Sequence, residues 1–141
     1  ILTSLLIFST TQSTGTTTTS SFSGPLVLDS DLILHNTGSN VQSRQGVLSQ
    51  DVSSNTTLID LGIYNSATFD YVVMNGSSMR AGNIASVWNG SSSSHNEINT
   101  TDLGNTSAVE FDVTNDGKLN VNVNSGTWTV QINYRALGYI I

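Results

Sequence analysis

Side chains able to carry acid–base, nucleophilic or metal chemistry are few in this chain and lie far apart. His35 and His95 have neither a histidine nor a cysteine at the spacing of a metal-ligand pair. Asp29, Asp31 and Asp102 could bind calcium, but Asp29-Ser30-Asp31 lacks the glycine and terminal glutamate of an EF-hand loop. Cysteine is absent, which removes disulfides and thiolate ligands. The sequence therefore predicts no metal site and no cofactor.

Catalytic signatures are equally sparse. Serine is abundant, yet no Gly-x-Ser-x-Gly motif occurs, and abundance alone does not indicate a Ser-His-Asp triad. Glycoside hydrolysis needs two carboxyl groups facing each other in a cleft, and ten acidic residues make some pairing inevitable. We expect no catalytic residues and a protein that is not an enzyme, with a polysaccharide-degrading enzyme as a lower-ranked alternative.

Aromatic and loop residues indicate where contacts with other molecules would form. We expect Trp88 and Trp128 to lie in the core or between subunits. The functional alternative is that one of them stacks on a sugar ring. A serine-rich loop is the segment expected to meet an external partner; it comprises Asn89, Gly90, Ser91, Ser92, Ser93, Ser94 and His95.

Two arginines lie within apolar strand patterns. Arg80 and Arg135 are each expected to pair with a carboxylate such as Asp70 or Glu110, or to cross a subunit boundary. They are therefore candidates for the core or for an interface. With Arg44 and Lys118 they are the only basic residues, so the chain has no basic patch for nucleic acid.

Alternation of apolar and polar residues is the dominant pattern. Residues 109–113, 119–123 and 128–134 alternate in this way, and glycine-containing turns at 115–117 and 124–126 join them as antiparallel hairpins. We expect strands at 58–64, 69–74, 79–88, 97–101, 108–114, 118–124 and 127–137. No window has a helical period with caps. The pattern predicts an all-β fold, an antiparallel β-sandwich that is jelly-roll-like and has an extended N-terminal arm.

Composition divides the chain into three sections. Residues 1–24 begin with a short apolar run, too short to span a bilayer, and continue as a Thr/Ser-rich tract; we expect a strand and an arm there. Residues 25–56 hold short strands that link or pack on neighbours, and residues 57–141 form the sandwich domain. Charged residues make up 10% of the chain and the net charge is −6. Without cysteine no disulfide can hold the domain, and self-association would add buried area, so we expect a homo-oligomer.

Several segments together suggest a family. Residues 69–82, the strand 84–88, and residues 102–106, 125–130 and 134–137 resemble a module of tail-fibre and other virion structural proteins of tailed bacteriophages. The resemblance implies a virion structural protein, such as a tail fibre, spike or capsid-decorating subunit. Its partners would be itself, as a homotrimer, other virion proteins and a host surface glycan, with no nucleic acid and no membrane. A secreted carbohydrate-binding or adhesin module is the alternative.

Overall fold

The computed structural model describes residues 27–36 and 38–139, in which every regular element is a β-strand. The strands are β1 (Leu32–Asn36), β2 (Val41–Val52), β3 (Thr56–Asp60), β4 (Ser66–Asn75), β5 (Ser78–Trp88), β6 (Ser93–Asn99), β7 (Val109–Val113), β8 (Lys118–Val123) and β9 (Trp128–Tyr139). The expected all-β sandwich is confirmed. The expected arm at residues 1–24 lies outside the described residues. No helix in the described part of the chain is long and apolar enough to cross a membrane.

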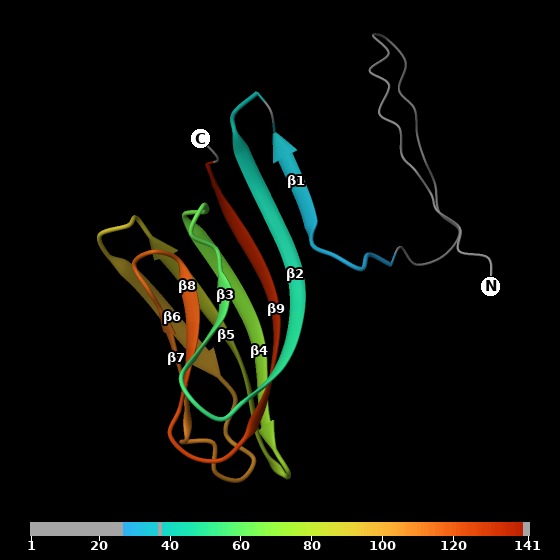
Figure 1. The fold of residues 1–141 in the computed structure, drawn as a ribbon, viewed down its shortest axis with the longest axis vertical. Coiled ribbons are helices and arrows are strands. Elements are labelled where there is room, and N and C mark those ends of the chain that lie inside the picture. Colours follow the sequence, from blue (N-terminus) through green and yellow to red (C-terminus); the bar gives the residue numbers. More distant parts are fainter. Residues whose placement is uncertain (1–26, 37, 140–141) are drawn as a thin grey trace, which may run out of the picture.

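Two antiparallel sheets form the sandwich (Figure 1). The large sheet has six strands in the order β1-β2-β9-β4-β5-β6, and the small sheet has three in the order β3-β8-β7. The small sheet lies over part of the large one, whereas β1 and the first half of β2 extend beyond it (Figure 1). All residues of β1 are accordingly exposed, while Val52 at the end of β2 is buried.

Period-two alternation explains the core between the sheets. Even-numbered residues of β9, among them Val130 and Ile132, point inward, and so do odd-numbered residues of β4, among them Phe69. Leu119 of β8 and Phe111 of β7 face them from the small sheet. The remaining alternate positions form the outer face of the large sheet, which no other described element covers.

Strand limits differ most from expectation where the sequence is polar. The segment 93–96 belongs to β6 because its backbone pairs with β5, with Ser93 opposite Trp88 and His95 opposite Ser86. β2 pairs with β9 from Val41 to Val52, so this part of residues 25–56 is an integral strand of the large sheet. Backbone pairing with a distant partner forms these strands without strong apolar alternation.

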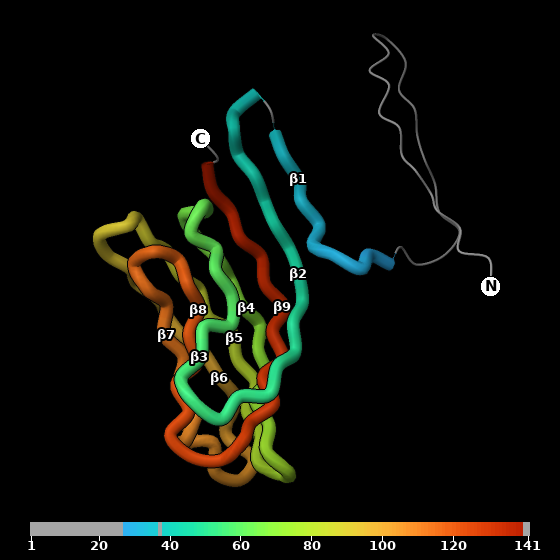
Figure 2. Tube along the Cα trace, in the orientation of Figure 1, coloured from blue at the N-terminus to red at the C-terminus, as the bar shows by residue number. Residues whose placement is uncertain are grey.

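Three turns gather at one end of the sandwich, where β9 also ends (Figure 2). They connect β3 to β4, β5 to β6 and β7 to β8. The amide of Leu61 donates to the carbonyl of Gly117 at 2.9 Å, and the amide of Gly90 donates to the carbonyl of Asn115 at 2.9 Å. The turns are therefore tied to one another through their backbones.

Candidate functional site

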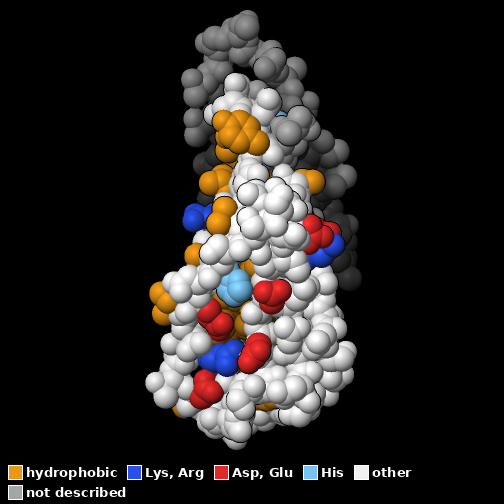
Figure 3. Space-filling view, turned by 90° about the vertical axis from the view of Figure 1, so that its left-hand side faces the viewer, with side chains coloured by type: hydrophobic (Ala, Val, Ile, Leu, Met, Phe, Trp, Pro, Cys, Tyr) orange, Lys and Arg blue, Asp and Glu red, His pale blue; other side chains and the backbone are white. Residues whose placement is uncertain are grey.

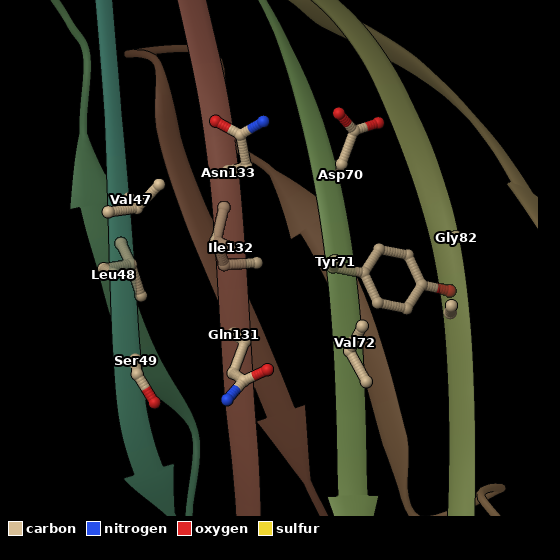
Figure 4. Close-up of a pocket in the computed structure, with 11 residues that line it drawn as sticks. Val47, Leu48, Ser49, Asp70, Tyr71, Val72, Gly82, Gln131, Ile132 and Asn133 are labelled. Atoms are coloured by element: carbon tan, nitrogen blue, oxygen red, sulfur yellow. The ribbon is translucent and has the colours of Figure 1, made fainter. Parts of the chain in front are cut away.

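A shallow groove runs across the outer face of the large sheet and has a volume of about 700 Å³ (Figure 4). Its sides come from neighbouring strands, with Val47 on β2, Gln131 on β9 and Val72 on β4. On the β5 side the groove is lined by the small residues Ala81 and Gly82, which do not rise far above the sheet. We call this surface the outer-face groove; it is lined by Val47, Leu48, Ser49, Asp70, Tyr71, Val72, Ala81, Gly82, Gln131, Ile132 and Asn133.

The outer-face groove is mainly apolar and contains one carboxylate, that of Asp70, which accepts a hydrogen bond from Asn83 Nδ2 at 2.8 Å. Towards Asn133 it continues into a polar hollow of about 410 Å³, where Arg135 lies exposed. Since only one carboxylate lines both hollows, this face has no facing acid pair for glycoside hydrolysis. Its chemistry suits contact with another surface.

On the inner face of the large sheet, the side chain of Tyr71 lies across Gly82 and reaches the edge strand β6. Tyr71 of β4 pairs with Gly82 of β5, and a Cβ at residue 82 would lie 2.6 Å from three atoms of the Tyr71 side chain. The missing side chain lets the ring lie across β5 (Figure 4). The Tyr71 hydroxyl then donates to Glu97 Oε1 on β6. The ring also packs against Phe111 of the small sheet, with centroids 4.5 Å apart.

Arg80 extends this arrangement from the large sheet to the small one. Its Nε donates to the Tyr71 hydroxyl at 3.0 Å, and its Nη2 donates to the Val109 carbonyl at 3.0 Å. Its Nη1 donates to the Thr106 hydroxyl at 3.1 Å, and its carboxylate neighbour is Glu97, 3.8 Å from Nη2. Neither Asp70 nor Glu110, the partners suggested from sequence, pairs with Arg80. The guanidinium fastens the two sheets together.

The same device recurs at the β1 edge. Tyr134 of β9 pairs with Gly46 of β2, where a Cβ would lie 2.6 Å from the tyrosine hydroxyl. The Tyr134 hydroxyl donates to Asp31 Oδ2 at 2.8 Å, and Arg44 Nε donates to the same oxygen at 2.5 Å. Each edge strand of the large sheet is thus held by a tyrosine, a carboxylate and an arginine. We call the two arrangements edge clamps.

Burial and hydrogen bonding alter the acidity of both clamp tyrosines. The pKa of Tyr71 rises to about 12, first because the phenol is buried and then because Glu97 accepts its proton in a hydrogen bond. The pKa of Tyr134 also rises to about 12, through burial and the hydrogen bond to Asp31. Both phenols are therefore neutral near pH 7 and act as hydrogen-bond donors.

The predicted contact residues occupy different regions. Trp88 and Trp128 lie in the core, each 4% exposed. The segment 89–95 is exposed throughout; it forms the β5–β6 turn and the first part of β6. Arg80 lies between the sheets, whereas Arg135 lies on the outer face. These residues therefore do not form one common site.

Polar chemistry in the described residues is dispersed. No group of three or more His, Asp or Glu side chains in residues 27–36 and 38–139 could hold a metal ion. Of the calcium candidates, Asp31 belongs to an edge clamp, and Asp102 accepts a hydrogen bond from Thr106. The clamp residues Tyr71 and Tyr134 were not identified as candidates. Their role depends on which glycine lies opposite, and the spacing along the chain does not reveal this.

Comparisons with known proteins concern the fold. No protein-family model matches the chain, and no curated protein matches it in sequence. The crystal structure of the tailspike protein gp49 from Acinetobacter baumannii bacteriophage Fri1, a capsular polysaccharide depolymerase, matches with a TM-score of 0.56 and 7% identity. The match covers 81% of this chain and 20% of that one. The tailspike protein of Acinetobacter phage vB_ApiP_P1 matches with a TM-score of 0.40 and 12% identity, over 84% of this chain and 25% of that one.

The expectation that the protein is not an enzyme is wrong. The solved structure with the higher TM-score is that of a depolymerase, so this fold occurs within an enzyme. The lack of a catalytic motif therefore does not exclude enzymatic function. The chain spans about a fifth of the length of the Fri1 tailspike. It shares the fold of one region of that tailspike.

Proposed function

We propose that this chain is a domain of a bacteriophage tailspike that assembles with copies of itself and takes part in attachment to bacterial surface polysaccharide. The observation that carries the proposal is the shared fold, which extends over 81% of the chain. The larger protein would degrade the polysaccharide, as the Fri1 depolymerase does. The sequence resemblance to phage tail proteins supports the same assignment.

The outer-face groove is the proposed contact between copies. Val47 at its β2 side is 79% exposed and presents an apolar side chain to the groove. Ile98 on β6 and Leu137 on β9 add exposed apolar area to the same face of the large sheet. Covering this face with another subunit would remove apolar surface from water, which favours association.

A homotrimer is the expected assembly, and light scattering over a dilution series tests it. We expect the native mass of a trimer that persists on dilution. Val47→Asp would place a carboxylate in the contact and should yield monomers, because an unpaired buried charge is strongly unfavourable. Leu103→Asp is the matched control, since Leu103 is also exposed but lies outside the groove.

The outcomes decide between assembly and independent function. A native chain that is monomeric at every concentration would contradict self-assembly through this face. A trimer that Val47→Asp leaves intact would show that another surface forms the contact.

A further inference from the structure

We propose that the end of the sandwich where the three turns meet binds a neutral saccharide residue. The inference rests on the proposed attachment function and uses a surface separate from the outer-face groove. A cleft of about 580 Å³ lies there, a volume within the range of small-ligand sites, about 300–1,000 Å³. We call it the turn-end cleft; its lining includes Tyr64, Asn65, Trp88, Asn89, Asn115 and Tyr139.

The framework of the turn-end cleft is fixed by backbone hydrogen bonds. The β7–β8 turn accepts from the β3–β4 turn at Gly117 and from the β5–β6 turn at Asn115, as described above. In addition, the amide of Trp88 donates to the carbonyl of Asn65 at 3.0 Å. Because the strands hold the turns in place, a ligand would meet a preorganised site, which lowers the entropic cost of binding.

Side-chain amides supply hydrogen-bond donors. Asn65 Oδ1 accepts from the amide of Tyr139 at 3.1 Å, and Asn89 Oδ1 accepts from the amide of Ser92 at 2.9 Å. No hydrogen bond within the described residues uses the Nδ2 group of either asparagine, and the Asn115 side chain takes part in none. These amides are therefore free to pair with the hydroxyl oxygens of a sugar.

Trp88 provides a further indication of a ligand. Its indole Nε1 is the one buried side-chain polar atom without a hydrogen-bond partner in residues 27–36 and 38–139. Trp128 is equally buried, yet its Nε1 donates to the carbonyl of Ser125 at 3.0 Å. Gly117 packs closely on this indole, since a Cβ at residue 117 would lie 2.5 Å from Trp88 Nε1. A sugar hydroxyl that reached Nε1 would supply the missing acceptor.

Aromatic and charged groups select a neutral saccharide. Tyr139 is 63% exposed at the cleft, where its ring can stack on the C–H face of a pyranose. Tyr64 forms a fixed wall, because its hydroxyl donates to Gln42 Oε1 at 2.7 Å. Asp116 also lines the cleft, and its carboxylate would repel anionic sugars although Lys118 Nζ lies 2.5 Å away. Figure 3 shows one face of the molecule, on which charged and histidine side chains gather in the lower half and uncharged groups cover most of the rest.

Titration with three monosaccharides tests the turn-end cleft. Glucose, galactose and N-acetylglucosamine are added to the full chain, and binding is followed by calorimetry and tryptophan fluorescence. We expect at least one sugar to bind and to change the fluorescence. Asn115→Ala, Tyr139→Ala and Trp88→Phe should each weaken binding about tenfold, the usual effect of losing one hydrogen bond or stacking contact. Asn75→Ala and Trp128→Phe, at the opposite end of the sandwich, should leave the affinity unchanged.

Two results would overturn the site. One is that none of the three sugars binds; the other is that Asn115→Ala and Tyr139→Ala, at exposed positions, both bind like the native chain. The native mass separates this outcome from failure of the proposed function. A trimer that binds no sugar refutes only the cleft, whereas a monomer that binds sugar at the cleft refutes only self-assembly.

Discussion

Replacing Gly82 with alanine tests the edge clamp at β6. The new Cβ would lie 2.6 Å from Cε1, Cζ and the hydroxyl oxygen of Tyr71, well inside normal contact distance. Tyr71 is buried and packs against Phe111, so the ring can move only by disturbing the core. The tyrosine must therefore move away from β5, which breaks its hydrogen bond to Glu97.

The magnitude follows from three contributions. Overpacking a core costs about 1–3 kcal/mol. Losing a hydrogen bond to a charged group costs about 1.5–3 kcal/mol. Alanine restricts the unfolded chain and offsets about 0.4–1 kcal/mol. We expect Gly82→Ala to lower the free energy of unfolding by about 2–5 kcal/mol.

Urea unfolding of four variants provides the assay. In the Tyr71→Leu background, alanine at residue 82 should cost about 0.5 kcal/mol or less, since the obstructing ring is gone. Gly38→Ala is the control, because a Cβ there meets only Asn36 Oδ1 at 3.4 Å. An equal loss in both backgrounds, or a loss below about 1 kcal/mol for the single variant, would refute the role of the tyrosine.

Two further predictions concern the same core. Tyr71 and Tyr134 have pKa values of about 12 in the fold and about 10 when unfolded, so their neutral phenols stabilise the fold fully below pH 10, and this contribution is lost as the pH rises to 12. Tyrosinate absorbance and circular dichroism followed together should show ionisation accompanying unfolding in that window; ionisation of both tyrosines at pH 10 in a folded chain would contradict it. Trp128→Phe should destabilise the fold by about 1 kcal/mol more than Trp88→Phe in urea unfolding, because only Trp128 loses an indole hydrogen bond. Equal losses would show that the two indoles have equivalent surroundings.

Local patterns predict much of this sandwich. β7, β8 and β9 are consecutive, alternate clearly and are joined by short glycine turns, so the sequence places them within a few residues. Strand β2 cannot be predicted in the same way, because residues such as Gln45 and Gly46 interrupt its apolar–polar alternation. Its partner β9 also lies far along the chain. Pairing between distant strands is a tertiary property that short-range periodicity does not contain.

Candidate sites depend even more on register. Gly82 and Tyr71 have ordinary strand environments in the sequence, and only their pairing reveals a clamp. Similarly, the sequence predicts both Trp88 and Trp128 as core residues, and only the structure shows that Trp88 Nε1 lacks a hydrogen-bond partner. The sequence does mark Asn89 and Asn115 as turn residues, but not that their turns meet.

The order of strands at the β1 edge also has a mechanical consequence. β1 and β9 run in the same direction on either side of β2, with Leu32 level with Arg135 and Asn36 level with Tyr139. Tension between the chain entering β1 and the chain leaving β9 would pull these strands past β2 in opposite directions. The hydrogen bonds of both ladders would then bear the load together instead of opening one by one, and the contacts of Asp31 would lie where the force enters. The sandwich should therefore resist stretching along its strands far better than peeling across them.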